Sequence, residues 1–504
     1  MTAPPAAVTD ARCLSDLYAS LSEVTDRGMH FEGGFTPWRD HFTASRKRAA
    51  ALRERLDPVR PTHVGVLLPN VPEFSFLFGA AALGAFVLVG LNSTRRGAAL
   101  AADVARADCQ IVIVSDETAE LIPADLPVPV LNVDGAEWAE TVSAASSDRF
   151  APAPVRPDDL VMLIFTSGTT GDPKAVRCSQ RKFGAPGVML AQRFGLGPDD
   201  VAYLSMPMFH SNSLIAGWSV AVAAGASIVL RRKFSATGFC EDVRRYGVTY
   251  ANYVGKPLRY VLATPERDDD ARSTLRLVYG NEAGAADRTE FARRFGARVV
   301  DGFGSTEGGV SITRTADTPD DALGPLTAPN AVVDPDTLEP VAAGRIGEIV
   351  NTAGAGLFDG YYGDEEATAQ RLRGGVYRTG DLGWVDDDGY VHFAGRLGDW
   401  LRVDGENLGT RPIEQILLRH RLIADATVLG VPDDIGDAVG AVLVAPGLTR
   451  ESLVEFLKAQ TDLGPKQWPT LVWLTDSQPE TATFKTARAA LAASLGEPTW
   501  RLAG

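Results

Sequence analysis

The chain has 504 residues, 45% of them hydrophobic and 22% charged, so it can fill several packed cores and is too long for one. Its formal net charge of -15 argues against nucleic acid or an anionic membrane as the main partner. Four scattered cysteines without a C-x-x-C pair argue against a disulfide framework or a zinc site. We see no signal peptide, and the most apolar stretch, residues 76–91, is short for a membrane span. A cytoplasmic protein is therefore expected.

Strand-like and helix-like segments alternate through the first 300 residues. Short apolar runs predict strands over 62–70, 86–92, 110–116, 158–167, 226–232, 248–254, 275–281 and 297–304. Helical patterns over 71–85 and 96–107 separate the first three of these strands. Such alternation predicts βαβ units and parallel sheets, which bind ligands at the carboxyl ends of their strands. The loops after Phe165, Tyr279 and Val300 are therefore the expected places for chemistry.

The pattern of predicted secondary structure changes from about residue 331. Short segments with tight turns predict antiparallel strands, and the DDDGY stretch at 386–390 predicts a hairpin. A smaller unit follows residue 396, with helices over 412–420 and 451–460 and strands over 425–431, 438–446 and 470–476. We place a domain boundary between residues 397 and 398.

The stretch LIFTSGTTGDPKAV at 163–176 has the residue types of a phosphate-binding loop. Glycines let the backbone approach an anion closely, hydroxyls donate hydrogen bonds, and a lysine adds charge. The residues concerned are Thr166, Ser167, Gly168, Thr169, Thr170, Gly171 and Lys174. Pro173 before the lysine and Ala175 after it exclude a Walker A loop, whereas an ordinary surface turn remains the alternative.

Four segments in order resemble motifs of the adenylate-forming superfamily, which includes acyl-CoA synthetases, luciferases and peptide-synthetase adenylation domains. They are TSGTTGDPK at 166–174, GFGSTEGG at 302–309, YRTGDLGWVDDDGYVHFAGRLGD at 377–399 and TATFK at 481–485. Three further segments, at 253–265, 276–284 and 405–410, are similar to the very-long-chain acyl-CoA synthetase and fatty-acid-transport-protein branch.

The resemblance implies an α/β fold in two domains. Residues 1–397 would form a large N-terminal adenylation domain of parallel-type sheets flanked by helices, plus a small β-barrel-like part. Residues 398–504 would form a small mobile α+β C-terminal domain, hinged at Gly398 or Asp399. The implied activity is a fatty-acid–CoA ligase that uses ATP, Mg²⁺ and coenzyme A. The fatty acid would react with ATP to give acyl-adenylate and pyrophosphate, and the thiol of coenzyme A would then release AMP.

The same resemblance implies roles for individual residues. Lys485 would bridge the carboxylate and the α-phosphate, Thr306 would contact the α-phosphate, and Glu307 with Thr170 would bind Mg²⁺. Asp381 and Arg396 would bind the ribose, and Gly405 would let the pantetheine arm approach. The nucleotide would also contact Asn281, Glu282, Asp301, Gly302, Phe303, Gly304 and Ser305.

Several alternatives stay open at this point. His210 is either a gate beside the acyl pocket or a structural histidine, and Phe303 lies either against adenine or in the core. The enzyme could be an acyl-AMP ligase that serves a carrier protein, or a CoA ligase for aryl or sterol-derived acids. The alternative from a different functional class is a protein that binds lipid without turning it over. Peripheral membrane contact is compatible with the sequence, which does not give the oligomeric state.

Overall fold

A computed structural model describes residues 13–151, 154–166, 173–397, 401–403, 406–433, 436–461, 463–481 and 486–502. The chain divides into two compact units. The first comprises Met1–Ser311 and Ala355–Gln370, and the second Ile312–Gly354 and Arg371–Gly504. The predicted boundary between residues 397 and 398 stays a prediction. None of the helices in the described ranges has the length and hydropathy needed to span a bilayer.

One sheet of the first unit has the strand order β6-β5-β3-β4-β7-β8. Its strands are β3 (His63–Leu67), β4 (Val87–Gly90), β5 (Cys109–Val114), β6 (Val130–Asn132), β7 (Leu160–Thr166) and β8 (Lys174–Ser179). All pairs are parallel except the antiparallel hairpin of β7 and β8. The predicted parallel sheet is confirmed. Strand β3, in the sequence HVGVL, is buried along its whole length, which explains its uninterrupted apolar pattern.

A second sheet of this unit runs β13-β12-β11-β9-β10-β1-β2. Its strands are β1 (Gly28–Phe31), β2 (Gly34–Pro37), β9 (Val201–Leu204), β10 (Ser227–Leu230), β11 (Tyr250–Val254), β12 (Leu277–Asn281) and β13 (Arg298–Gly304). The pairs from β1 to β13 are parallel, so the carboxyl ends of β9, β11, β12 and β13 share one edge. A further short strand, β14 (Ser311–Thr313), lies at the boundary of the two units.

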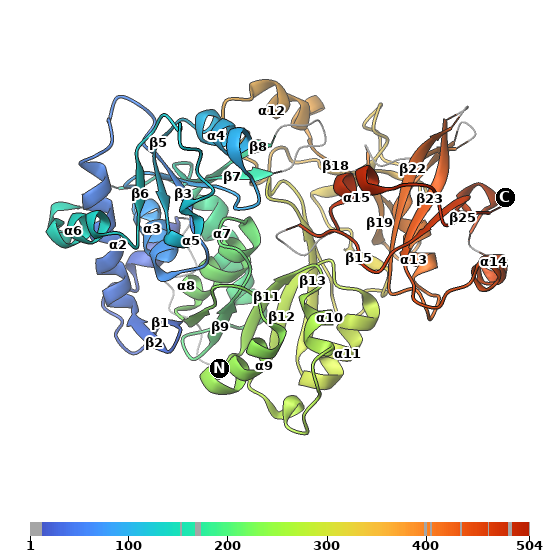
Figure 1. Cartoon of the computed structure of the whole chain (residues 1–504), viewed down its shortest axis with the longest axis horizontal. Coiled ribbons are helices and arrows are strands. Elements are labelled where there is room, and N and C mark those ends of the chain that lie inside the picture. Colours follow the sequence, from blue (N-terminus) through green and yellow to red (C-terminus); the bar gives the residue numbers. More distant parts are fainter. Residues whose placement is uncertain are drawn as a thin grey trace. The chain divides into compact units, whose positions relative to one another are not determined.

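Helices cover the sheets of the first unit (Figure 1). They are α1 (Leu14–Ala19), α2 (Trp38–Arg53), α3 (Pro72–Ala82), α4 (Gly97–Arg106), α5 (Asp116–Ala119), α6 (Ala136–Ala144), α7 (Gln180–Phe194), α8 (Val220–Ala224), α9 (Ala236–Tyr246), α10 (Pro257–Leu262), α11 (Ala285–Phe295) and α12 (Glu365–Arg371), with a π-helix over Ser213–Ser219. Helices α9, α10 and α11 pack on the second sheet through a core that includes Val243, Val261 and Phe291. Helix α9 begins after Ser235, whose side chain accepts from Gly238 N, and ends at Gly247 with φ 65°.

The second unit contains two further sheets. An antiparallel sheet in the order β15-β19-β18-β17-β16 comprises β15 (Ala322–Pro325), β16 (Asn330–Val333), β17 (Gly347–Asn351), β18 (Tyr377–Val385) and β19 (Tyr390–Arg396). The predicted β-barrel-like part takes this form, and the hairpin predicted at 386–390 joins β18 to β19.

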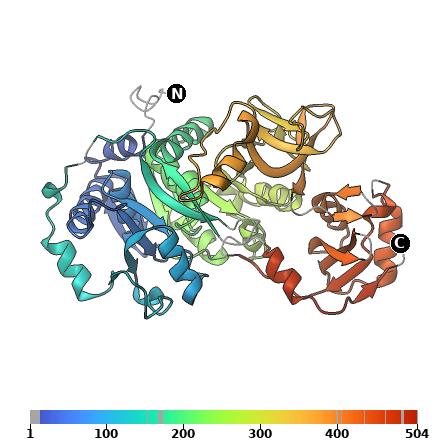
Figure 2. The ribbon, with the colours of Figure 1, turned by 90° about the horizontal axis from the view of Figure 1, so that it is seen from above.

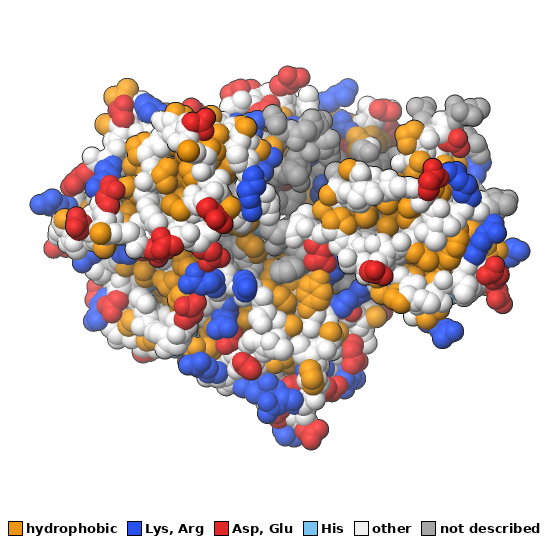
Figure 3. All heavy atoms as spheres, in the orientation of Figure 1, with side chains coloured by type: hydrophobic (Ala, Val, Ile, Leu, Met, Phe, Trp, Pro, Cys, Tyr) orange, Lys and Arg blue, Asp and Glu red, His pale blue; other side chains and the backbone are white. Residues whose placement is uncertain are grey.

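The C-terminal residues form an α+β group with its own core, drawn in orange and red in Figure 2. It comprises β20 (Leu401–Val403), β21 (Glu406–Leu408), β22 (Asp425–Asp433), β23 (Gly436–Val444), β24 (Leu471–Leu474), β25 (Trp500–Arg501), α13 (Thr410–Leu417), α14 (Arg450–Ala459) and α15 (Arg488–Ser494). The predicted α/β class, with a separate C-terminal α+β part, is confirmed. On the face in Figure 3, acidic and basic side chains are interspersed rather than gathered by sign.

Candidate active site

Strands β7 and β8, which flank the glycine-rich stretch in the sequence, pair with each other in an antiparallel arrangement. Thr166, the last residue of β7, pairs with Lys174, the first residue of β8. Ser167, Gly168, Thr169, Thr170 and Gly171 lie outside the described residues. Nζ of Lys174 lies 5.3 Å from the ring centroid of Tyr361, a cation–π contact. The ends of the loop are thus placed where a parallel sheet binds its ligands.

Glu307 lies just beyond the carboxyl end of β13 and is 8% exposed. Its Oε1 accepts a 2.9 Å hydrogen bond from the hydroxyl of Tyr361. Its backbone carbonyl accepts a 2.8 Å hydrogen bond from Nζ of Lys182. The neighbouring Thr306 hydroxyl is 2.9 Å from the hydroxyl of Ser211. The predicted metal-binding and phosphate-binding residues therefore sit in a segment anchored at several points.

Asp301 on β13 is surrounded by donors from the protein. Its Oδ1 accepts from the hydroxyl of Tyr253, and its Oδ2 accepts from Ala283 N at 3.2 Å and from Nη1 of Arg288 at 3.4 Å. Burial, and then the Asp301 carboxylate, raise the pKa of Tyr253 well above its ordinary value, so the hydroxyl stays protonated and donates. Asp301 joins β11, β12 and α11, and its contact with adenine stays a prediction.

The loops after β12 and β13 bring together the other residues expected at the nucleotide. Nδ2 of Asn281 donates to the carbonyl of Gly302. Glu282 is exposed and adopts φ 68°, a left-handed conformation that is uncommon for a residue with a side chain. Phe303 is only partly buried, unlike the core phenylalanines of α11, and Gly304 and Ser305 are exposed. A partly exposed aromatic ring fits a place against adenine better than a place in the core.

The segment after β9 lies against the same loops. His210 is partly buried, with its ring centroid 4.3 Å from that of Phe209. Nδ2 of Asn212 lies 3.3 Å from the carbonyl of Tyr253 and 3.4 Å from Oδ1 of Asn281. The carboxyl ends of β9, β11, β12 and β13 are thereby connected through side chains.

In the second unit, Asp381 on β18 is directly opposite Arg396 on β19. Nε of Arg396 donates to Oδ1 of Asp381 at 3.2 Å, and Asp381 is 8% exposed while the arginine is largely exposed. The two residues predicted at the ribose thus form one pair. Gly398, Asp399, Gly405 and Lys485 lie outside the described residues, so their predicted roles stay predictions.

Comparisons with known proteins decide the family. Residues 24–362 match the family model of the AMP-binding enzyme, and residues 412–485 match that of the AMP-binding enzyme C-terminal domain. The chain belongs to the AMP-binding enzyme family. The predicted membership of the adenylate-forming superfamily is confirmed, and with it the prediction of a ligase that uses ATP, Mg²⁺ and coenzyme A.

The sequence similarity to known relatives covers nearly the whole of this AMP-binding enzyme. It is 56% identical over 496 residues to a medium/long-chain-fatty-acid–CoA ligase of Mycobacterium tuberculosis, covering 97% of this chain and 98% of the relative. It is 44% identical over 464 residues to the steroid-22-oyl-CoA synthetase of Rhodococcus jostii, covering 88% and 83%. The fold is similar to that of ATP-bound MatB from Rhodopseudomonas palustris, with TM-score 0.86, 24% identity and coverage of 95% and 98%.

The AMP-binding enzyme site suits Mg²⁺ held together with phosphate oxygens. Mg²⁺ is usually bound by one or two carboxylates while the substrate phosphates and water complete its shell. Glu307 offers such a carboxylate, and the described residues contain no group of three or more His, Cys, Asp or Glu side chains able to hold a metal alone. A single carboxylate beside a phosphate loop is the expected donor set.

Sequence reasoning did not single out three residues that the structure places at this site. Tyr361, Lys182 and Ser211 contact Glu307 or Thr306, yet each comes from a segment far away along the chain. No local pattern points to them: Tyr361 is one of two adjacent tyrosines, and Lys182 reads as an ordinary helix residue. Tertiary contact alone assigns them to the site.

Proposed function

We propose that this chain joins a medium- to long-chain fatty acid to coenzyme A, with ATP converted to AMP and pyrophosphate. The relative named for this reaction shares 56% of its residues along 97% of this chain. The relative named steroid-22-oyl-CoA synthetase makes side-chain acids of steroids the second candidate substrates.

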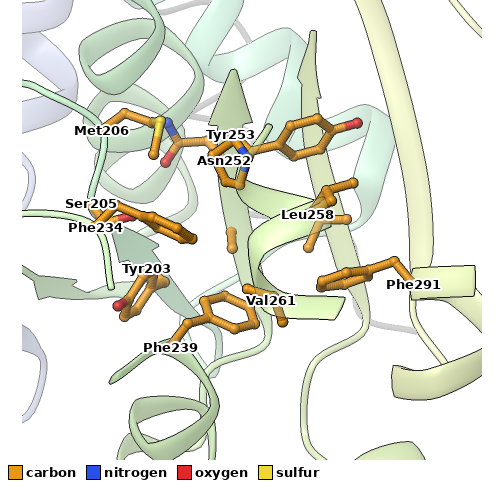
Figure 4. Close-up of a pocket in the computed structure, with 13 residues that line it drawn as sticks. Tyr203, Ser205, Met206, Phe234, Phe239, Asn252, Tyr253, Leu258, Val261 and Phe291 are labelled. Carbon is orange, nitrogen blue, oxygen red and sulfur yellow. The ribbon is translucent and has the colours of Figure 1, made fainter. Parts of the chain in front are cut away.

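A buried apolar cavity carries the proposal. It lies between the second sheet and helices α9 to α11 and has a volume of about 20 Å³, so an acyl chain would enter it by displacing side chains of the wall. Figure 4 shows Met206, Phe234, Phe239, Leu258, Val261 and Phe291 around it. An apolar wall of this kind favours an acyl chain, because each buried methylene contributes about 0.8 kcal/mol.

Tyr253 links this cavity to the nucleotide loops. The residue lines the cavity, and its hydroxyl donates to Asp301 on β13. An acyl chain in the cavity would therefore have its carboxylate end near the carboxyl ends of β11 to β13, where Thr306 and His210 lie. Of the two alternatives for His210, this placement favours a gate beside the acyl pocket, next to the carboxylate, over a structural histidine.

The chemistry assigns a role to each group. A carboxylate oxygen of the acid attacks the α-phosphorus of ATP and pyrophosphate leaves; the sulfur of coenzyme A then attacks the acyl carbonyl and AMP leaves. Both steps develop charge on phosphate or carbonyl oxygens, so positioned cations and donors are the main requirement. Lys485 and Thr306 would act at the α-phosphate, Thr166 to Lys174 at the β- and γ-phosphates, and Glu307 with Thr170 at Mg²⁺.

The remaining residues would bind the rest of the nucleotide and coenzyme A. Asp381 and Arg396 would hold the ribose; Phe303 would stack on adenine; the loops at 281–282 and 301–305 would line the base; and Gly405 would admit the pantetheine arm. We also propose that residues 398–504 move as one domain about Gly398 or Asp399, and that the enzyme works in the cytoplasm.

Pyrophosphate release across acids of graded length and steroid side-chain acids, with mass analysis of the products, tests the proposal. Release that depends on a medium- or long-chain acid, with acyl-CoA and AMP as products, is the expected result. Acyl-AMP as the final product with or without coenzyme A would favour the acyl-AMP ligase instead. Chain binding without pyrophosphate release would favour a lipid-binding protein.

A further inference from the structure

Lys182 is a lysine buried inside the first unit. It lies on α7, is 1% exposed, and its Nζ donates to the carbonyls of Glu307 at 2.8 Å and Arg177 at 3.3 Å. Burying an ammonium group is costly unless its hydrogen bonds are satisfied, and lysine is among the side chains least often buried. The position of Lys182 is therefore tied to the backbone of Glu307 on one side and of β8 on the other.

Tyr361 holds the side chain of the same glutamate. Its hydroxyl donates to Oε1 of Glu307 at 2.9 Å, and the residue is 5% exposed. The tyrosine is itself fixed, since its backbone N–H donates to the Thr368 hydroxyl at 2.9 Å and it forms a β-bridge with Val176 on β8. Within the described residues, no protein group pairs with the second carboxylate oxygen of Glu307.

The chain turns sharply after Glu307, and this turn packs against the side chain of Lys182. Gly308 adopts φ +75°, and its N–H donates to the carbonyl of Ser305 at 3.1 Å. A Cβ at this position would lie 3.3 Å from Cβ of Leu357 and 3.5 Å from Cε of Lys182. The lysine stem thus packs directly beneath the turn that presents the carboxylate.

We propose that Lys182 and Tyr361 are positioning residues that hold Glu307 for the divalent cation, Lys182 through the backbone and Tyr361 through the carboxylate. This inference rests on the proposed role of Glu307 as the metal ligand. A carboxylate that is already oriented loses less conformational freedom when it binds a cation, and groups that orient metal ligands typically change metal affinity 10- to 100-fold when removed. Neither residue contacts the metal in this account.

Cation binding can be measured without turnover. Free Mn²⁺ is followed by electron paramagnetic resonance in the presence of a non-hydrolysable ATP analogue, with wild type, Lys182→Met, Tyr361→Phe and Glu307→Gln. We expect all three variants to weaken Mn²⁺ binding about tenfold or more, with Glu307→Gln the weakest binder. Lys458→Met, which removes an exposed lysine on α14, is the matched control and should bind as wild type does.

Steady-state rates add a second readout. In the two positioning variants the Mg²⁺ concentration for half-maximal rate should rise by a similar factor, while KM for the fatty acid stays within twofold of wild type. A loss of kcat with unchanged Mg²⁺ and Mn²⁺ constants would mean that the residues only support folding, and would overturn the proposal. Thermal melting checks that each variant is folded. If Lys182→Met does not fold, Tyr361→Phe decides, because it deletes a single oxygen and keeps the ring beside Lys174.

The Mn²⁺ measurements distinguish the metal role of Glu307 from the positioning role of Lys182 and Tyr361. If Glu307→Gln binds Mn²⁺ as tightly as wild type, the metal role of Glu307 is wrong. If Glu307→Gln weakens binding and Tyr361→Phe does not, the metal role stands and the positioning proposal is wrong.

Discussion

The hydroxyl of Tyr361 donates a 2.9 Å hydrogen bond to Oε1 of Glu307, while the ring of the same tyrosine lies 5.3 Å from Nζ of Lys174. One side chain therefore connects the acidic residue after β13 with the lysine that begins β8. The main chain supports this connection, because Arg177 N donates to the carbonyl of Gly360 at 3.0 Å. The two groups expected to handle the phosphates and their metal are fixed relative to each other before any ligand binds.

Tyr253→Phe tests the link between the acyl cavity and the nucleotide loops. The change keeps the ring in the cavity wall but removes one of the donors to Asp301, so the loop after β12 should lose order. We expect KM for ATP to rise about fivefold and stability to fall by about 1.5–3 kcal/mol, as for a hydrogen bond to a charged group.

Tyr250→Phe is the matched control for that change. Tyr250 lies on the same strand and is equally buried, but its hydroxyl donates to the carbonyl of Ala216 instead. It should lower stability without altering KM for ATP. Equal KM values for ATP in the Tyr253→Phe variant and wild type would contradict the predicted link.

Asp381→Asn tests the ribose site. The amide removes the negative charge that faces Arg396 and replaces one acceptor oxygen with a donor, so KM for ATP should rise about tenfold, equivalent to about 1.4 kcal/mol. Asp388→Asn, in the exposed turn between β18 and β19, provides the control on the same hairpin. Parallel titrations with ATP and with 2′,3′-dideoxy-ATP, which lacks both ribose hydroxyls, show whether the loss arises at the ribose. The variant should discriminate less between the two nucleotides than wild type does.

Ala251→Leu should shorten the acids that the enzyme accepts. Ala251 is 4% exposed and lines the cavity, so a larger side chain would occupy space meant for the acyl tail. We expect kcat/KM for the longest accepted acids to fall at least tenfold, while kcat/KM for short acids stays within about threefold of wild type. The larger side chain should also lower the stability of the fold by about 1–3 kcal/mol. Ala51→Leu, a buried change on α2, should lower stability without altering chain-length preference. An unchanged length profile would contradict the placement of the acyl chain.

Burial of His41 should make the stability of the fold depend on pH. The residue is fully buried between the hydroxyls of Tyr18, at 2.6 Å, and Ser75, at 2.8 Å, and burial lowers its pKa to about 3. An unfolded histidine titrates near 6.5, so the unfolded chain binds one more proton between these values. The stabilisation is complete above about pH 6.5 and is lost as the pH falls toward 3, at about 1.4 kcal/mol per pH unit.

Urea unfolding of wild type and His41→Gln at several pH values between about 5 and 7 measures this contribution. Glutamine cannot titrate, so the stability of the variant should fall less steeply with decreasing pH, by a slope equivalent to one proton. Identical slopes for the two proteins would show that His41 takes up its proton equally easily in both states.

The sequence allowed most of the strands to be predicted and part of the site. Strands such as β3 and β11 are buried throughout, so their apolar runs are unmistakable, and the turn at 386–390 marks its hairpin. The π-helix over Ser213–Ser219 was not predicted, because its apolar residues have no periodicity of their own that separates it from an α-helix. The bridge between Tyr361 and Val176 on β8 was not predicted either, since it joins segments far apart along the chain.

Site residues divide in the same way. Glu307, Asp381 and Lys174 belong to contiguous motifs, so their chemistry could be inferred from neighbours in the sequence. Lys182 and Tyr361 act through contacts across 125 and 54 residues of chain, which only the folded structure reveals. The donors to Asp301 from Tyr253, Ala283 and Arg288 were equally hidden, and they give that residue a structural role besides any contact with the base.

The reaction itself is tested most directly by isotope transfer. A medium- or long-chain fatty acid labelled with oxygen-18 in its carboxylate is incubated with the enzyme, ATP, Mg²⁺ and coenzyme A, and the products are analysed by mass spectrometry. If a carboxylate oxygen attacks the α-phosphorus, AMP acquires one labelled oxygen, pyrophosphate acquires none, and acyl-CoA retains the other. Unlabelled AMP, or label in pyrophosphate or inorganic phosphate, would contradict activation of the acid as its adenylate.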